Sequence, residues 1–187
     1  TIGIEAALWA NNIPPGYYRN DFGFMRWRNY NEKLHDTIFE NSINKIREDK
    51  VEIIANDIDA FTLKKAISNT KNAKVDDVVT CTNQSFFDIQ PSREGGVVIL
   101  NPPYGERMAV PEIEKMYKEI GDKLKKDFKN FNAWIITSSP EAIKSIGLRT
   151  SRKIQIYNGA LECRYLKFEL YGGSKKASKN PGTMVRR

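Results

Sequence analysis

Short apolar runs alternate with amphipathic segments along most of this chain, and this alternation constrains its fold more than any other feature. Four runs have the length and composition of strands: 51–56, 78–82, 97–100 and 133–137. Three segments between or after them have the pattern of helices: 60–72, 111–129 and 140–146. Strand–helix alternation predicts an α/β fold with a doubly wound, mostly parallel sheet. The last two runs, 153–157 and 161–171, flank Asn158-Gly159, which predicts an antiparallel hairpin at the end of the sheet.

Two further helices are predicted before the first strand, over 1–11 and 32–49. Four apolar residues fall roughly on one face of the second helix: Leu34, Ile38, Ile43 and Ile46. The segment 17–30 between the two helices is rich in aromatic residues and arginine, which would suit a nucleic-acid stacking surface. The favoured interpretation is an irregular loop pinned to the body by its aromatic rings. His35, the only histidine, is interpreted as a surface residue on a polar helix face rather than a catalytic group.

The length of 187 residues suits one domain, predicted over 1–171, followed by a basic flexible tail over 172–187. The net charge of +7 favours a polyanionic partner. No apolar stretch approaches the roughly 18 residues that a membrane span needs, so no membrane partner is expected. Cys81 and Cys163 both fall in apolar, strand-like runs. This favours buried free thiols in a reducing cytoplasm, and two cysteines are too few for a zinc site.

The clearest indication of chemistry lies where one predicted strand ends. The run 97–100 is followed directly by Asn101, Pro102, Pro103 and Tyr104. Ligands of open α/β sheets bind at the C-terminal ends of strands, and the two prolines stiffen this turn and leave its carbonyls free to accept. The Asn101 side chain and the Pro102 carbonyl could accept the two N–H groups of an exocyclic amine while Tyr104 stacks on a planar base. The alternative is a rigid loop with an incidental tyrosine.

The predicted architecture and the Asn-Pro-Pro-Tyr strand end resemble the class I, Rossmann-like S-adenosyl-L-methionine-dependent methyltransferases that act on exocyclic amino groups of nucleobases. Four segments resemble more closely the bacterial 23S (large-subunit) ribosomal RNA guanine-N2 methyltransferases: 1–7, 13–16, 56–59 and 101–107. The resemblance covers roughly 1–171. It implies a cytoplasmic enzyme that transfers a methyl group from S-adenosyl-L-methionine to N2 of a guanine in ribosomal RNA. It also implies an RNA-binding THUMP module in an upstream segment of the same protein.

The resemblance implies a set of contacts to the cofactor. Asp57 would accept hydrogen bonds from both ribose hydroxyls, and Ile58 would lie against the adenine. Asp88 would accept from the adenine amino group beside the Phe87 backbone, and Asn101 would also border the cofactor. Both carboxylates have a structural alternative, because Asp57 could instead cap the following helix and Asp88 could instead form a turn.

The chain departs from the family in lacking a glycine-rich turn. The family binds the methionine part of the cofactor on such a turn, after the first strand, but no Gly-x-Gly occurs in this sequence. We therefore expect the first strand and the turn to be missing from this sequence. Their absence would leave a gap, with unpaired backbone on both sides, between the strands that end at Asp57 and Asn101.

Two residues are expected to contact RNA. Tyr104 would stack on the target base, and Arg107 would contact a phosphate or the edge of the target. A helix-capping or salt-bridge role for Arg107 is an equal alternative. The target guanine has to be unpaired or flipped out, since the amino group of a paired guanine is buried. Three other functions stay open: a transfer-RNA guanine-N2 methyltransferase, a DNA adenine-N6 methyltransferase, and a non-catalytic RNA-binding or assembly module.

Overall fold

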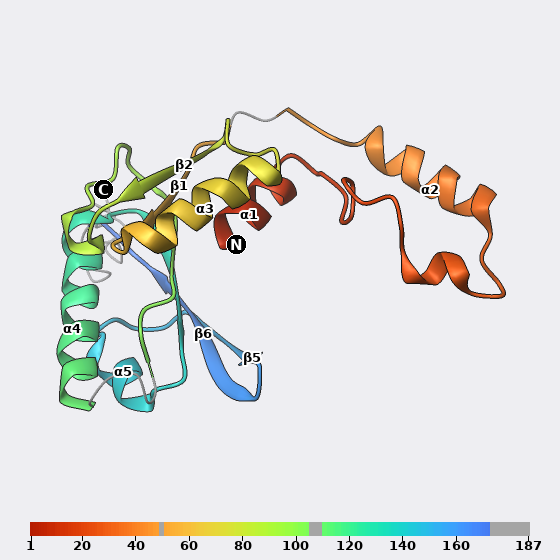
Figure 1. Cartoon of the computed structure of the whole chain (residues 1–187). Helices are drawn as coiled ribbons and strands as arrows, with labels where there is room; N and C mark the ends of the chain where they lie inside the picture. Colours follow the sequence, from red (N-terminus) through yellow and green to blue (C-terminus); the bar gives the residue numbers. More distant parts are fainter. Residues whose placement is uncertain (49–50, 105–109, 173–187) are drawn as a thin grey trace, which may run out of the picture. The chain divides into compact units, whose positions relative to one another are not determined.

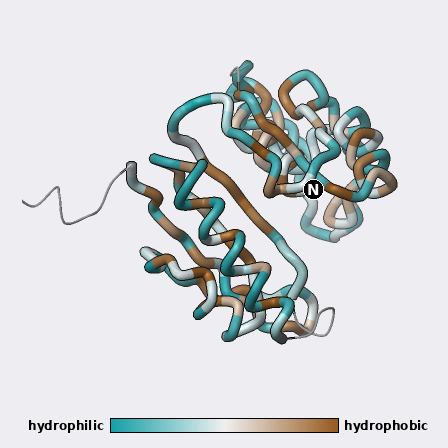
Figure 2. Tube along the Cα trace, turned by 90° about the vertical axis from the view of Figure 1, so that its left-hand side faces the viewer, coloured by the Kyte–Doolittle hydropathy of each residue, from teal (hydrophilic) through white to brown (hydrophobic). Residues whose placement is uncertain are grey.

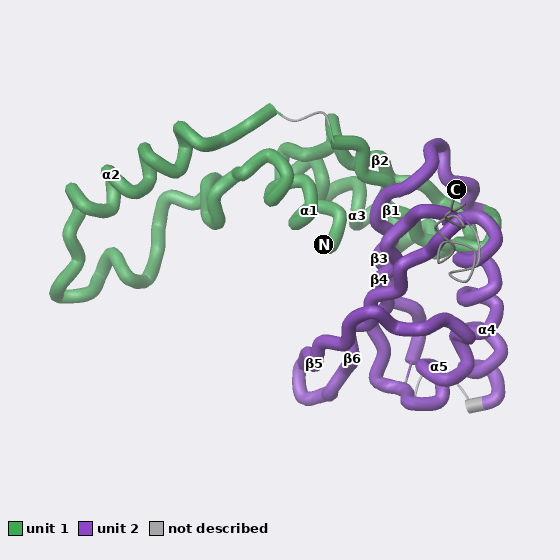
Figure 3. The backbone as a smooth tube through the Cα atoms, turned by 180° about the vertical axis from the view of Figure 1, so that it is seen from behind, with its two compact units in different colours: residues 1–88 green, residues 89–187 purple. Residues whose placement is uncertain are grey.

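The computed structural model describes residues 1–48, 51–104 and 110–172. The chain divides into two compact units, unit 1 over 1–88 and unit 2 over 89–187 (Figure 3). Arg107 and all but the first residue of the predicted tail, 172–187, lie outside the described residues. None of the helices in the described part of the chain is long and apolar enough to cross a membrane.

Unit 1 contains a two-stranded parallel sheet with helices packed on it (Figure 1). Its elements are α1 (Ile2–Ala10), η1 (Gly23–Arg26), α2 (Glu32–Ile43), β1 (Ile53–Asp57), α3 (Ala60–Asn72), β2 (Val79–Asn83) and η2 (Phe86–Asp88). β1 and β2 run in parallel with Asp57 opposite Asn83, so both strands end at the same edge. A small core of Ala7, Val75 and Val79 joins α1 to this sheet. The strand–helix–strand order is the one that the apolar runs predict.

The start of α3 is fixed by its N-cap residue, Asp59. The Asp59 carboxylate accepts hydrogen bonds from the backbone N–H groups of Phe61 and Thr62, at 3.3 and 2.9 Å. The Thr62 hydroxyl also donates to it, at 2.6 Å. These bonds, the one from the Thr62 hydroxyl first, lower the pKa of Asp59. The cap satisfies donors that the first turn of a helix leaves without a partner.

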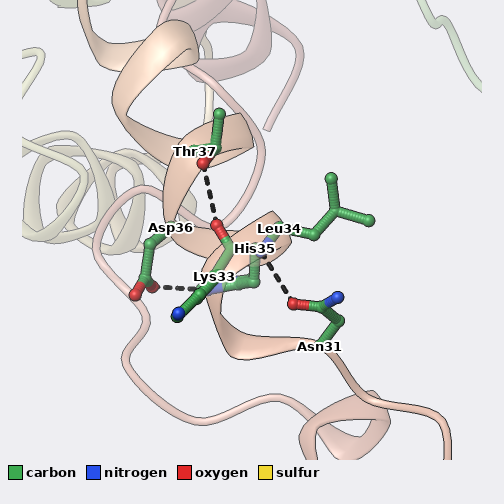
Figure 4. A network of polar contacts seen from close by, with 6 residues as sticks. All are labelled: Asn31, Lys33, Leu34, His35, Asp36 and Thr37. Atoms are coloured by element: carbon green, nitrogen blue, oxygen red, sulfur yellow. Dashed lines mark hydrogen bonds and ion pairs between the residues drawn. The ribbon is translucent and has the colours of Figure 1, made fainter.

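The helix predicted over 32–49 is shorter in the structure, because α2 ends at Ile43. Asn31 caps its N-terminus by accepting from the Leu34 N–H at 3.0 Å (Figure 4). At the other end, the Arg47 N–H donates to the carbonyl of Asn11 at 2.8 Å. This hydrogen bond to a residue distant in sequence takes the place of a helical one, so the chain leaves the helix before residue 49. The prediction of the helix end is therefore wrong.

The aromatic segment 17–30 contacts α2 through ring packing. The His35 ring lies 5.8 Å from the ring centroids of Phe24 and Tyr30, and it stacks on Phe39 at 6.1 Å. These rings therefore tie the segment to α2, while its attachment to the rest of the chain through aromatic rings stays a prediction. The surface assignment of His35 is wrong, since its side chain is only 23% exposed within this cluster. Leu34, in contrast, is exposed, as is Ile38 one turn later, so the expected apolar face of α2 is not buried.

Unit 2 contains a four-stranded mixed sheet in the order β3-β4-β6-β5. Its elements are β3 (Gly96–Leu100), α4 (Val110–Asp127), β4 (Phe131–Thr137), α5 (Pro140–Ser145), β5 (Arg152–Asn158) and β6 (Leu161–Glu169). β3 and β4 are parallel, whereas β6 is antiparallel to both β4 and β5. The hairpin predicted around Asn158-Gly159 is confirmed, with Gly159 at a φ of 63° in the turn. The α/β class with antiparallel C-terminal strands is therefore confirmed.

The core of unit 2 is built on α4 and β4. Buried hydrophobic residues recur every three or four positions along α4: Ile113, Tyr117, Ile120 and Leu124. The tube of α4, the helix nearest the viewer in Figure 2, accordingly carries both hydrophilic and hydrophobic stretches. Gly121 lets α4 approach α5, because a Cβ there would lie 1.9 Å from the carbonyl oxygen of Ile146. In β4 the buried positions alternate, as expected of a strand with one face in the core.

Four strands of the described residues have a ladder on one side only: β1, β2, β3 and β5. Two of them, β1 and β3, concern the gap that the sequence predicts. Within 1–48, 51–104 and 110–172, β1 pairs with β2 alone and β3 pairs with β4 alone. Apolar side chains on both strands are exposed, with Ile54 at 52% and Val97 at 63%. These are the two strands, ending at Asp57 and Asn101, between which the sequence predicts a missing neighbour.

Candidate active site

The turn after β3 presents an amide and a carbonyl that are free to accept. Asn101 is exposed, and its side chain has no hydrogen-bond partner among the described residues. Pro102 is half-buried, and no hydrogen bond from a described residue reaches its carbonyl oxygen. A proline has no N–H to donate, so Pro102 and Pro103 contribute acceptors alone. The turn can therefore accept two hydrogen bonds from a planar amine.

The ring of Tyr104 is fixed from its hydroxyl end by the C-terminal hairpin. Asn158 Nδ2 donates to the Tyr104 hydroxyl at 3.1 Å, and the Cys163 thiol donates to the same oxygen at 3.8 Å. Asn158 is the last residue of β5, and Cys163 is a fully buried residue of β6. The hairpin thus sets the direction of the Tyr104 ring relative to the β3 end.

The carbonyl of Pro103 is held by α4. The hydroxyl of Tyr117 donates to this oxygen at 3.4 Å, and the Tyr117 side chain is completely buried. Burial raises the pKa of Tyr117 to about 12, while a hydrogen bond with Thr137 acts in the opposite direction. The phenol therefore stays protonated and can donate at any physiological pH. Pro103 is anchored, whereas the neighbouring Pro102 carbonyl is left available.

A second group of polar residues lies at the ends of β1 and β2 in unit 1. The side-chain amide of Asn83 donates to the carbonyls of Asp57 and Ile58, at 2.9 Å each, and so ties the two strand ends together. Asp57 Oδ1 accepts from the backbone N–H of Asp59 at 2.9 Å. The cap of α3 is Asp59, so Asp57 does not have the capping role that was its structural alternative. Ile58 is 73% exposed beside it, which is unusual for an isoleucine and suits contact with an apolar ring.

Phe87 and Asp88 follow β2 in the short helix η2. The Phe87 N–H donates to Ser85 Oγ at 3.3 Å, and the Asp88 N–H donates to the Ser85 carbonyl at 3.0 Å. The Phe87 N–H is therefore occupied by Ser85, the residue just before η2. The Asp88 carboxylate is exposed and has no partner among the described residues. Because β1 and β2 are parallel, the residues after them share one edge of the sheet.

The structure assembles the predicted site residues as two groups, one in each unit. Asp57, Ile58, Phe87 and Asp88 belong to unit 1, and residues 101–104 belong to unit 2. Arg107 lies outside the described residues. Three residues that hold these groups in place were missed from the sequence: Asn83, Tyr117 and Asn158. The Asn-Gly pair marks Asn158 only as a turn residue, and the helical repeat marks Tyr117 only as a core residue. Neither sequence pattern indicates a hydrogen bond to the site.

Comparison with known proteins places the chain in a family. Residues 1–167 match the family UPF0020, described as RMKL-like, methyltransferase domain. The ribosomal RNA large subunit methyltransferase K/L of Shewanella frigidimarina is 34% identical over 182 residues, which are 94% of this chain and 25% of that protein. The chain thus spans about a quarter of the length of this curated relative.

Two solved structures have the same fold. One is SMU.472, described as a methyltransferase and complexed with SAH (S-adenosylhomocysteine), with a TM-score of 0.82 and 26% identity over 92% of this chain and 46% of the other. The other is described as a predicted N6-adenine-specific DNA methylase from Listeria monocytogenes. Its TM-score is 0.77, with 26% identity over 90% of this chain and 43% of the other. The mixed sheet and the Asn-Pro-Pro-Tyr strand end are consistent with the family match over 1–167. The chain therefore belongs to the RMKL-like methyltransferase domain family.

Proposed function

We propose that this chain is part of an S-adenosyl-L-methionine-dependent methyltransferase that modifies the exocyclic N2 amino group of a guanine in 23S ribosomal RNA. The observation that carries the proposal is the exposed amide of Asn101 beside the carbonyl of Pro102, at the end of a parallel strand, where neither group has a partner among the described residues. The name of the Shewanella relative supports ribosomal RNA as the substrate. The +7 net charge agrees with a polyanionic partner.

The residues of unit 1 fit the nucleoside part of the cofactor. The Asp57 carboxylate would accept from the two ribose hydroxyls, since among the described residues only its Oδ1 is engaged, by the Asp59 N–H. Ile58, exposed at the strand end, would lie against the adenine. Asp88 would accept from the adenine amino group. When bound, S-adenosyl-L-methionine supplies an electrophilic methyl group on a sulfonium.

The residues of unit 2 would bind and orient the target base. The lone pair of an exocyclic nitrogen is delocalised into its ring, which makes that nitrogen a poor nucleophile. Two acceptors, Asn101 Oδ1 and the Pro102 carbonyl, would take its two N–H groups and favour sp³ geometry, so that the lone pair is directed out of the ring plane. Tyr104 would stack on the base and set its plane. Catalysis would then be mainly positioning, an effect that can supply as much as about 7–11 kcal/mol.

A further strand, outside this sequence, would complete the sheet. β1 and β3 each have one unpaired edge among the residues described, and both expose apolar side chains. A parallel strand inserted between them would give hydrogen-bond partners to the unpaired backbone groups of both strands. Such pairing is expected, because unpaired backbone groups are costly when buried. A glycine-rich turn after that strand would bind the methionine part of the cofactor. The THUMP module implied by the resemblance belongs, by the same proposal, to an upstream segment of the protein.

The test is methyl transfer by the full-length protein to 23S ribosomal RNA transcribed in vitro, read by mass spectrometry of the nucleosides. N2-methylguanosine is the expected product. Asn101→Ala should reduce turnover by at least a hundredfold and leave the Kd for the cofactor, measured by calorimetry, within about twofold. Asn132→Ala, a half-buried asparagine on the neighbouring strand β4, is the matched control and should retain turnover. A mild effect of Asn101→Ala would contradict the proposed role of the amide.

One alternative substrate has a specific observation in its favour. The Listeria relative in structure is described as a predicted N6-adenine-specific DNA methylase, and adenine N6 is also an exocyclic amine. The same pair of acceptors would serve either base. Parallel reactions with double-stranded DNA and with transfer RNA distinguish the substrates, and N6-methyl-2′-deoxyadenosine in DNA as the main product would replace the ribosomal assignment.

A further inference from the structure

Unit 1 contains a cavity of about 660 Å³ that is separate from the residues assigned to methyl transfer. Its lining residues come from the last turn of α1, the loop that follows it, and the segment that ends α2. Ligand sites typically have volumes of about 300–1,000 Å³, so the cavity can accommodate a nucleotide. None of the residues that line it belongs to the β1, β2 or β3 ends.

The walls of the cavity are tied together by hydrogen bonds. Asn12 Nδ2 donates to the carbonyl of Lys45 at 2.9 Å, across 33 residues of sequence. Arg47 donates from its backbone N–H to Asn11 at 2.8 Å and from Nη2 to the Ala10 carbonyl at 3.0 Å. These bonds join the end of α1 to the end of α2. They therefore brace two walls of the cavity against each other.

Three aromatic rings line this cavity, and two of them are exposed. Trp9 is 84% exposed and Tyr18 is 45% exposed. Tyr17 supports Tyr18 through an edge contact at 4.9 Å and stacks on Phe39 of α2 at 6.4 Å. The ammonium of Lys74 lies 4.9 Å from the Tyr18 ring centroid. Exposed, supported rings next to a cation are the usual stacking platform for unpaired bases.

The charges on the lining favour an anion. Arg19 and Lys45 are basic, whereas Glu5 is the acidic lining residue. Arg19 is held in place, because its Nε donates to the Asp21 carbonyl at 2.7 Å and its guanidinium lies 5.2 Å from the Phe22 ring centroid. Lys45 is exposed, and its ammonium has no partner among the residues described. Both cations can therefore reach a phosphate at the mouth of the cavity.

We propose that this cavity binds an unpaired nucleotide of a single-stranded RNA segment, with the base stacked on Trp9 and Tyr18 and the phosphate paired with Lys45 and Arg19. The proposal rests on the proposed function in taking RNA as the substrate. It adds a docking site outside the catalytic residues. Such a site would hold a single-stranded segment of the RNA substrate.

The test is binding of a fluorescein-labelled single-stranded oligouridylate by the full-length protein, followed by fluorescence anisotropy without cofactor. Trp9→Ala should lower the affinity about tenfold or more, and Trp9→Phe, which keeps a stacking ring, should restore most of it. Lys45→Ala should also reduce the slope of log affinity against log salt by about 0.7. Trp27→Ala is the matched control, since Trp27 is 67% exposed in the same unit but does not line the cavity.

Each outcome supports or overturns the site. Equal losses in Trp9→Ala and Trp27→Ala, or no loss in either, would overturn it, and so would equal affinity for double-stranded RNA. A thermal melt of each variant checks folding, and the exposure of Trp9 predicts an unchanged Tm. If the cavity variants lose RNA binding while the wild-type protein forms no N2-methylguanosine in 23S ribosomal RNA, the docking site stands and the proposed catalytic function fails. If binding is unaffected while Asn101→Ala abolishes transfer, only the docking site fails.

Discussion

The phenol of Tyr117, at the centre of α4, donates a hydrogen bond to the carbonyl oxygen of Pro103 in the turn after β3. This contact links the core of unit 2 to the proposed catalytic turn, because Tyr117 is fully buried and cannot move without disturbing its packing. Of the two proline carbonyls, it fixes the one that the proposed mechanism does not use as an acceptor for the base. Tyr117 is thus a positioning residue for the acceptor next to it.

Tyr117→Phe is expected to lower kcat without changing cofactor affinity. The substitution keeps the ring and removes the hydrogen bond, whose net contribution of about 0.5–1.5 kcal/mol corresponds to roughly a two- to tenfold loss of turnover. Single-turnover methyl transfer and calorimetry with the cofactor measure the two effects. Tyr165→Phe is the control, since Tyr165 is half-buried in the same unit and stacks on Trp134 at 4.5 Å. A matching loss in the control would indicate a general packing effect.

The same phenol predicts how stability depends on alkaline pH. Burial raises the pKa of Tyr117 to about 12 in the folded state, against an ordinary value of 10.0. The unfolded chain therefore loses this proton first, and the free energy of unfolding should fall as the pH rises from about 10 towards about 12. Urea unfolding of the wild type and of Tyr117→Phe between about pH 9 and about pH 11.5 measures this fall. The free energy of unfolding should decline less steeply with pH in Tyr117→Phe than in the wild type. Parallel curves for the two proteins would contradict the raised pKa of Tyr117.

Asp59 predicts the opposite behaviour in acid. Hydrogen bonds from Thr62 and Phe61 lower the pKa of its carboxyl in the folded state. Its stabilising effect on α3 is therefore present above the ordinary pKa of an aspartate and is lost as the pH falls through the lowered value. Asp59→Ala should reduce stability at neutral pH and flatten the acid limb of the stability curve. Asp57→Ala serves as the comparison, because Asp57 does not accept from the first N–H groups of α3. An equal flattening of the acid limb in Asp57→Ala would argue against the cap.

The ring and the hydroxyl of Tyr104 are expected to contribute separately. Tyr104→Phe keeps the stacking surface and loses the bonds from Asn158 and Cys163, so turnover should fall about two- to tenfold. Tyr104→Ala also loses stacking, worth about 1–3 kcal/mol per base. Its turnover should therefore fall further, and its KM for RNA should rise. Steady-state kinetics on the same transcript compare the two variants. Equal losses would mean that stacking contributes little.

Local sequence patterns predict the elements of this fold because they report local physics. Asn158-Gly159 predicts a hairpin since glycine adopts a φ of 63° at little cost, and the structure has that turn. The end of α2 was missed because it depends on the Arg47–Asn11 hydrogen bond, which joins residues far apart in sequence.

The candidate site is predictable to a similar extent. Residues 101–104 stand out because two prolines after an apolar run have few structural explanations. Their supports do not stand out, since Asn158 and Cys163 lie 54 and 59 residues from Tyr104 in the chain. A pattern of apolar positions marks Tyr117 as a core residue and contains no information about its hydroxyl. Contacts between distant residues therefore limit what the sequence predicts about this site.

Close packing of α4 against α5 predicts a large effect of one added methyl group. A Cβ at Gly121 would lie 1.9 Å from the carbonyl oxygen of Ile146, and a backbone atom cannot rotate away. Gly121→Ala should therefore destabilise the protein by about 2 kcal/mol or more, despite the better helix propensity of alanine. Gly23→Ala is the control, because a Cβ there meets no atom within 4 Å, and it should change stability by less than about 0.5 kcal/mol. Urea unfolding at neutral pH compares the two, and an unchanged midpoint for Gly121→Ala would show that the two helices can separate at little cost.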